Sequence, residues 1–198
     1  MAQREEILEE DQHRAQLYGL LARTLVRPPD DELLAALREI EGNESEIGIA
    51  LNGLALAANA ATVDSIEDEF QELFIGVGRG ELVPFGSYYL TGFLNEKPLA
   101  RLRQEMARLG IERADGVAEP EDHIGSVCEI MAGLIRGDFG SPMPVAEQAA
   151  FFERHIGSWA GQFFKDLETA KSATFYRPVG ALGRVFLEIE TTAFEMAA

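Results

Sequence analysis

The 198-residue sequence has one cysteine, and this scarcity limits the compartments in which the protein works. A lone thiol, Cys128, cannot form an internal disulfide, which is typical of proteins in a reducing environment. The first residues carry acids where a secretory signal has a basic segment and then an apolar run. We therefore predict a cytoplasmic protein.

Long apolar runs are absent as well. The most apolar stretch, residues 47–61, is interrupted by glycine and asparagine and is too short to span a bilayer. We therefore expect no stable membrane insertion. Cys128 lies on an apolar helical stripe, which favours a buried small side chain over a reactive thiol.

Basic residues are few compared with acids. The chain has 17 Lys and Arg against 34 Asp and Glu, which gives a formal net charge of -17. Such a charge repels nucleic-acid phosphates and anionic membrane surfaces, and it attracts cationic partners. We therefore expect no nucleic-acid partner. The alternative is that the acidity serves solubility alone.

Motifs for catalysis, metals or phosphate groups are also scarce. His13, His123 and His155 lie on separate predicted helices, and none has a second metal ligand three or four residues away. Residues 76–80 are rich in glycine, but they follow a helix rather than a strand and lack the spacing of a phosphate loop. We therefore predict a non-enzyme without catalytic residues, a metal site or a cofactor. His13 and His155 are expected at the surface or its boundary.

What the sequence does contain is apolar residues at helical spacing along almost its whole length. One stripe, at about 100° per residue, follows residue 123. It consists of Ile124, Val127, Cys128, Met131, Leu134 and Ile135. No alternating run is long enough for a sheet, so we predict an all-α fold of eight or more helices in a single domain over residues 1–198.

Residues 76–90 interrupt this helical pattern and form the first motif. The segment has four glycines, and its second half contains Pro84, Phe85, Gly86, Ser87, Tyr88 and Tyr89. Flexible linkers seldom carry clustered aromatic residues, so we predict an ordered loop. Helices are predicted on both sides, one of them containing Phe70 and Phe74 on a single face.

The second motif concentrates polar residues before the stripe at residue 124. It contains Glu119, Pro120, Glu121, Asp122 and His123. Pro120 suits a first helical position, and acids in a first turn stabilise the unpaired amides and the positive end of the helix dipole. We therefore predict a helix from Pro120, with Asp122 folding back onto its first-turn amides and His123 at the border of the stripe.

The two motifs, in this order on a helical chain of this size, resemble the TorD/DmsD family of molybdoenzyme maturation chaperones over roughly residues 10–190. The resemblance implies a TorD-like all-helical chaperone, a monomer or a helix-exchanged dimer. It also implies two partners, the twin-arginine leader and the apoenzyme of an exported molybdenum- or tungsten-dependent oxidoreductase. The chaperone binds the leader and assists cofactor insertion before export.

The resemblance also assigns residues to leader binding. They are Asp122, His123, Glu119 and Pro120 from the second motif and Pro84, Ser87, Tyr88 and Tyr89 from the first. Phe85 and Gly86 depart from the family's commoner tyrosine and glutamate, which puts a hydrogen-bonding or charge role there in doubt. Alanine at Asp122 or His123 is expected to weaken leader binding and to leave the melting temperature nearly unchanged.

Physical chemistry leads to the same kind of receptor. A twin-arginine leader presents a cationic segment and then an apolar one, so its receptor needs carboxylates beside an apolar groove. Glu119, Glu121 and Asp122 offer the carboxylates. The aromatic contact area is expected from Phe70, Phe74, Phe85 and Tyr88. The alternative for the first two, spaced i and i+4, is a place in the core.

Two other functions are kept as alternatives. A general helical adaptor would bind a folded protein without contacting a leader. A weak nucleotide-binding hydrolase would need a phosphate-binding loop and magnesium ligands, for which the sequence has no motif.

Overall fold

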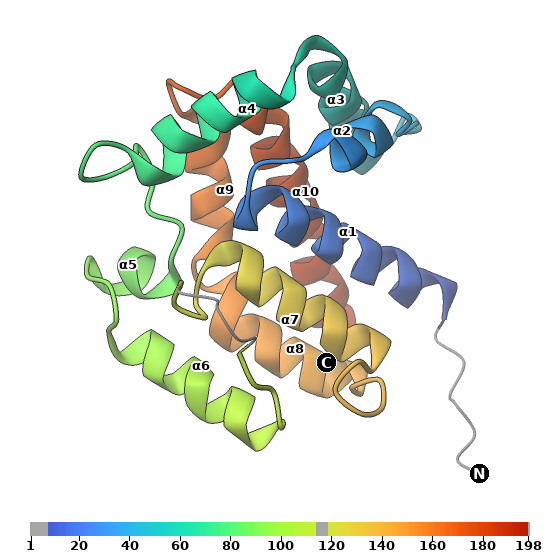
Figure 1. Cartoon of the computed structure of the whole chain (residues 1–198). Helices are drawn as coiled ribbons and strands as arrows, with labels where there is room; N and C mark the ends of the chain where they lie inside the picture. Colours follow the sequence, from blue (N-terminus) through green and yellow to red (C-terminus); the bar gives the residue numbers. More distant parts are fainter. Residues whose placement is uncertain (1–7, 114–118, 198) are drawn as a thin grey trace. The chain divides into compact units, whose positions relative to one another are not determined.

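The computed structural model describes residues 8–113 and 119–197, which are mostly helical (Figure 1). These residues contain ten α-helices, two π-helical turns and no strand, so the predicted all-α fold is confirmed. The elements are α1 (Glu9–Val26), α2 (Asp31–Arg38), α3 (Glu46–Ala60), α4 (Val63–Phe70), η1 (Gln71–Ile75), α5 (Gly86–Thr91), α6 (Lys97–Arg108), α7 (Ile124–Arg136), α8 (Val145–Phe152), η2 (Glu153–Gly157), α9 (Ala160–Thr169) and α10 (Tyr176–Ala197).

The chain divides into two compact units. Unit 1 comprises Met1–Val26, Phe85–Trp159 and Ala193–Ala198, and unit 2 comprises Arg27–Pro84 and Ala160–Thr192. The prediction of one domain over residues 1–198 stays a prediction. Within the described part of the chain no single helix is long and apolar enough to cross a membrane, and the one pair that passes this test together, Glu46–Ala60 with Val63–Ile75, is bent by 112°.

Unit 1 is organised around α7, which packs along α1 (Figure 1). The predicted apolar stripe of α7 is buried, and burial raises the pKa of the Cys128 thiol to about 12, so this thiol is inert as expected. Close approach of the two helices requires a glycine. A Cβ at Gly125 would lie 2.5 Å from Val26 Cγ2 and 3.1 Å from Val26 N.

Unit 2 contains α2, α3, α4, η1, α9 and most of α10, with α2 packed on α3. Its helices begin where the sequence supplies caps: Asp30 accepts from Leu33 N and Ser45 accepts from Gly48 N. The start of α10 has an acceptor distant in sequence. Glu69 of α4 accepts hydrogen bonds from the backbone N–H groups that lead into α10, at distances of 2.7 Å (Thr174), 2.9 Å (Phe175) and 2.8 Å (Tyr176).

Three helix boundaries differ from the sequence-based predictions. The predicted loop of residues 76–90 contains the first five residues of α5. The apolar residues Phe152, Ile156, Trp159 and Phe163 have the spacing of one continuous helix, but the segment is divided between α8, η2 and α9, with a turn after Gly157. The helix predicted from Pro120 begins only at Ile124, because residues 120–122 form a turn that is closed by a 3.1 Å bond from His123 N to Pro120 O.

Candidate functional site

In unit 1 the two sequence motifs meet at the starts of α5 and α7. The backbone N–H of Ser87 donates to Asp122 Oδ2 at 2.7 Å, and the backbone N–H of Gly86 donates to the backbone oxygen of Asp122 at 2.9 Å. Phe85 and His123 form an isolated antiparallel bridge, with ring centroids 5.1 Å apart. Two segments 35 residues apart therefore hold one another in a polar corner.

His123, rather than Asp122, caps α7. Its Nδ1 accepts a hydrogen bond from Gly125 N at 3.1 Å, a position usually held by a short polar side chain. The prediction that Asp122 folds onto the first turn of its own helix is therefore wrong. Asp122 accepts instead from the amides of α5, a contact that helical periodicity does not reveal.

Burial lowers the pKa of His123 from its ordinary 6.5 to about 4, because the cation would lose its hydration. The ring is thus neutral at pH 7, as its role of Nδ1 acceptor requires. A neutral imidazole does not repel the positive end of the α7 dipole, so capping and burial favour the same protonation state.

Because His123 is buried and neutral, the free energy of unfolding should depend on pH. His123→Asn should remove this dependence. Since the unfolded chain takes up the proton near pH 6.5 and the folded chain only near pH 4, stability is complete above pH 6.5 and falls as the pH drops toward 4. Between pH 7 and pH 5 we expect the wild type to lose about 2 kcal/mol more than His123→Asn, in which asparagine keeps the cap. Urea unfolding at both pH values measures this, and equal losses would contradict it.

The corner is closed to solvent in this structure, and the assignment of its residues to leader binding stays a prediction. Asp122 is 4% exposed, His123 7% and Ser87 0%. Pro84, the last residue of this segment of unit 2, is buried as well. The Asp122 carboxylate already binds Ser87 N, so it is not available to an arginine in this structure. Its Oδ1 atom and the Ser87 hydroxyl are buried and have no hydrogen-bond partner among the described residues.

The accessible residues of the two motifs lie around this corner. Glu119 is exposed, and the half-buried ones are Phe85, Tyr88, Tyr89, Pro120 and Glu121. The Tyr89 ring lies 5.7 Å from that of Trp159, which in turn covers Gly86 so closely that a Cβ there would be 3.0 Å from the indole. Packing thus orients the aromatic face of α5, and only part of the predicted site is accessible.

Glu121 is accessible but already paired. It accepts a hydrogen bond from Arg103 Nε at 2.8 Å, and Arg113 lies 4.0 Å away. Burial, the largest influence, raises the pKa of Glu121, but the hydrogen bond and charge of Arg103 outweigh it, and the pKa is lowered. Of the three carboxylates predicted to meet arginines, Glu119 alone has no described partner.

A second paired acid was missed in the sequence. Glu105 of α6 binds Arg154 and His155 of η2, the latter at 2.7 Å. Burial raises the pKa of Glu105, yet hydrogen bonds from Arg154 and His155 bring it down to about 2. His155 is 8% exposed, so the prediction of a surface or boundary position is wrong. A partner 50 residues away leaves no signal in local spacing.

Phe70 and Phe74, predicted as leader contacts or core residues, belong to unit 2. Their rings are 5.0 Å apart and lie 6.0 and 5.4 Å from the ring of Tyr176, while Phe74 also lies 6.5 Å from Phe163. Both are half-buried. They therefore pack within the unit and keep part of each ring accessible.

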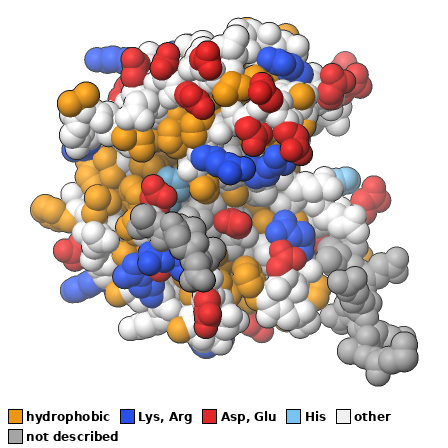
Figure 2. All heavy atoms as spheres, viewed as in Figure 1, with side chains coloured by type: hydrophobic (Ala, Val, Ile, Leu, Met, Phe, Trp, Pro, Cys, Tyr) orange, Lys and Arg blue, Asp and Glu red, His pale blue; other side chains and the backbone are white. Residues whose placement is uncertain are grey.

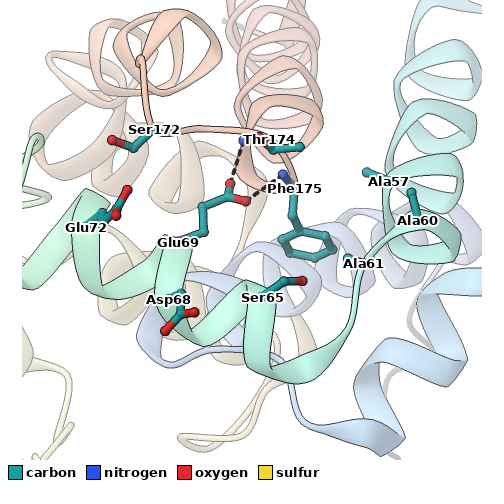
Figure 3. A pocket seen from close by; sticks show the side chains of 10 residues that line it. All are labelled: Ala57, Ala60, Ala61, Ser65, Asp68, Glu69, Glu72, Ser172, Thr174 and Phe175. Atoms are coloured by element: carbon teal, nitrogen blue, oxygen red, sulfur yellow. Dashed lines mark hydrogen bonds between the residues drawn. The ribbon is translucent and has the colours of Figure 1, made fainter.

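Unit 2 also contains a pocket that sequence reasoning missed (Figure 3). Its volume is about 420 Å³, and it is lined by Ala57, Ala60, Ala61, Ser65, Asp68, Glu69, Glu72, Ser172, Thr174 and Phe175. Glu69 points to the backbone of residues 174–176, whereas Asp68 and Glu72 are exposed and have no described partner. The pocket thus combines apolar walls with two unpaired carboxylates. The only signal was the i, i+4 spacing of these acids.

Among the described residues, no group of three or more His, Cys, Asp or Glu side chains is placed to hold a metal ion. The half-buried aromatic face of α5 in unit 1 and the acidic pocket in unit 2 are partly accessible surfaces. The fold defines an all-helical protein.

Comparisons with known proteins identify its family. A family model described as nitrate reductase delta subunit matches residues 41–165, so the chain belongs to this family, and the resemblance to TorD and DmsD is confirmed. Chaperone protein TorD of Vibrio atlanticus is 25% identical over 186 residues, or 90% of this chain and 79% of that protein. The Tat proofreading chaperone DmsD of Salmonella typhimurium is 27% identical over 168 residues, or 81% and 79%.

A solved structure supports the fold. A protein described as a redox enzyme maturation protein from Archaeoglobus fulgidus matches with a TM-score of 0.59 and 20% identity, over 93% of this chain and 99% of that one. The two relatives are named as chaperones rather than enzymes, in agreement with the prediction of a non-enzyme.

Proposed function

We propose that this protein is a cytoplasmic chaperone that binds the twin-arginine leader of an exported molybdoenzyme precursor and assists its maturation before export. The observation that carries the proposal is family membership, together with relatives named TorD and Tat proofreading chaperone DmsD. The client is a molybdenum- or tungsten-dependent oxidoreductase, and the chaperone acts on its apoenzyme before the cofactor is inserted.

In unit 1, the leader contacts the accessible face of α5 rather than the buried corner. Tyr88 and Tyr89 offer rigid aromatic area to an apolar segment, and Glu119 offers a carboxylate. Asp122 and His123 act through position, since they hold the starts of α5 and α7. This division explains why polar residues of the motif are buried while their aromatic neighbours are accessible.

Unit 2 supplies further contacts of the same chemistry. Asp68 and Glu72 present unpaired carboxylates at a pocket with the ring of Phe175 in its wall, which suits a guanidinium on an aliphatic stem. The accessible edges of Phe70 and Phe74 suit apolar residues of the leader.

The test is a titration of the full chain with a synthetic twin-arginine leader labelled for fluorescence anisotropy. We expect saturable binding that weakens as the salt concentration rises from about 50 mM to about 500 mM, because salt screens the attraction between charged groups. A matched peptide with glutamine in place of both arginines should bind about tenfold or more weakly, since charge-assisted bonds contribute roughly 1.5–3 kcal/mol each.

Equal affinity for the two peptides would contradict recognition of the arginines. Tight binding of the folded precursor after deletion of its leader would instead favour a general helical adaptor. An exported molybdoenzyme precursor that co-purifies with the protein from its native host would supply the natural leader and precursor for both experiments.

A further inference from the structure

One helix of this acidic protein is strongly basic. The 12 residues of α6 include four basic side chains and one acid, although the whole chain has only 17 basic residues. The acid, Glu105, is bound by Arg108, Arg154 and His155. In Figure 2 blue side chains lie in the region where Figure 1 draws α6.

The basic residues form a stripe on the outer face of α6. At about 100° per residue, Lys97, Arg101 and Arg108 fall within one narrow arc, opposite the buried apolar face of the helix. That buried face consists of Leu99, Leu102 and Met106. All three stripe residues are exposed, and neither Lys97 nor Arg101 has a described partner. Two positive charges are therefore free for an external ligand.

Exposed apolar side chains lie directly before this stripe. Phe93 is 70% exposed and Leu94 45% in the turn between α5 and α6. The turn begins at Gly92, with a φ of 82°, and a Cβ at that glycine would meet nothing within 4 Å. Large apolar residues at an open turn beside basic residues are typical of proteins that lie on anionic membranes.

We propose that the α5–α6 turn and the basic stripe of α6 form a peripheral contact surface for anionic lipid membranes. Lys97 and Arg101 contact the headgroups, and Phe93 and Leu94 enter the interface between headgroups and acyl chains. The net charge of -17 opposes this only in part, because salt screens exposed charges beyond a Debye length of about 8 Å. The charges on the face next to the bilayer therefore determine binding more than the net charge of the whole protein does.

The proposal is tested by co-sedimentation of the full chain with large vesicles. The probes are vesicles of phosphatidylcholine alone and of phosphatidylcholine with about one third phosphatidylglycerol, an anionic lipid. We expect measurable binding to the anionic vesicles at low salt, little to the neutral ones, and loss of binding at about 0.5 M salt.

Two variants with the same net charge distinguish a local surface from overall repulsion. Lys97→Glu with Arg101→Glu should weaken vesicle binding about tenfold or more, since each change replaces an attraction to the anionic headgroups with a repulsion. The control, Lys165→Glu with Arg177→Glu, changes exposed basic residues of α9 and α10 and should bind like the wild type. An acid at the first position of α6 favours the helix, so the first variant should fold.

Phe93→Ser with Leu94→Ser should also weaken vesicle binding and leave helical circular dichroism unchanged, because both side chains are exposed. Equal binding by the Lys97/Arg101 variant and the wild type overturns the proposal, as does equal loss in the control variant. Binding to soluble polyglutamate that depends on Lys97 and Arg101, without vesicle binding, would overturn it in favour of an acidic protein partner.

Discussion

Glu69→Ala is expected to destabilise the protein more than any other single change to its polar contacts. The carboxylate accepts three backbone hydrogen bonds within unit 2, from Thr174, Phe175 and Tyr176, and alanine leaves these donors without their protein acceptor at the start of α10. Bonds to a charged acceptor contribute roughly 1.5–3 kcal/mol each and are not additive, so we expect a loss of about 3–5 kcal/mol. Urea unfolding monitored by circular dichroism measures it.

The controls are the two other acids of the same pocket. Asp68→Ala and Glu72→Ala remove the same charge from exposed side chains without described partners, so stability should change by about 0.5 kcal/mol or less. Glu69→Gln keeps an acceptor oxygen but loses the charge, and its loss should be intermediate. If Glu69→Ala were as mild as the controls, the role of Glu69 in holding the start of α10 would be refuted.

Asp122→Ala is expected to give the second largest loss, about 2–3 kcal/mol. The change removes the charged acceptor of Ser87 N in a corner where water does not replace it. The sequence alone led us to expect an unchanged melting temperature, and the buried contact now makes a loss of stability the expected result. Thermal unfolding should show a lower midpoint, by several degrees at about 2–4 °C per kcal/mol for a chain of this size.

Measurements of leader affinity distinguish residues that position α5 from residues that contact the leader directly. Because Asp122 holds the start of α5, Asp122→Ala should also lower the affinity for the leader, since Tyr88 and Tyr89 would be displaced. Asp122→Asn keeps an acceptor for Ser87 N and should retain most of the stability. Glu119→Ala removes an exposed carboxylate, so it should lower the affinity for the leader without changing the stability of the protein. Unchanged stability in Asp122→Ala would mean that the contact with α5 contributes little.

Local signals in the sequence were sufficient for the all-helical class, though not for every helix boundary or cap. Asp30 and Ser45 act as caps where short polar side chains precede apolar periodicity, and the stripe of α7 is buried as predicted. Local signals also misled: Pro120 and its acids are typical of a helix start, yet they form a turn before α7. Propensity allowed both conformations, and the bonds between Asp122 and α5 favour the turn.

The sequence by itself determined the all-helical class, the buried face of α7 and the two motifs by which the family is recognised. Each depends on residues within a few turns of one another, where spacing implies proximity. Tertiary structure alone decided which acids are accessible. Asp122, Glu105 and Glu69 find their partners 35, 50 and 105 to 107 residues away, and pairing with distant groups, rather than residue type, decides which carboxylates stay free for a ligand.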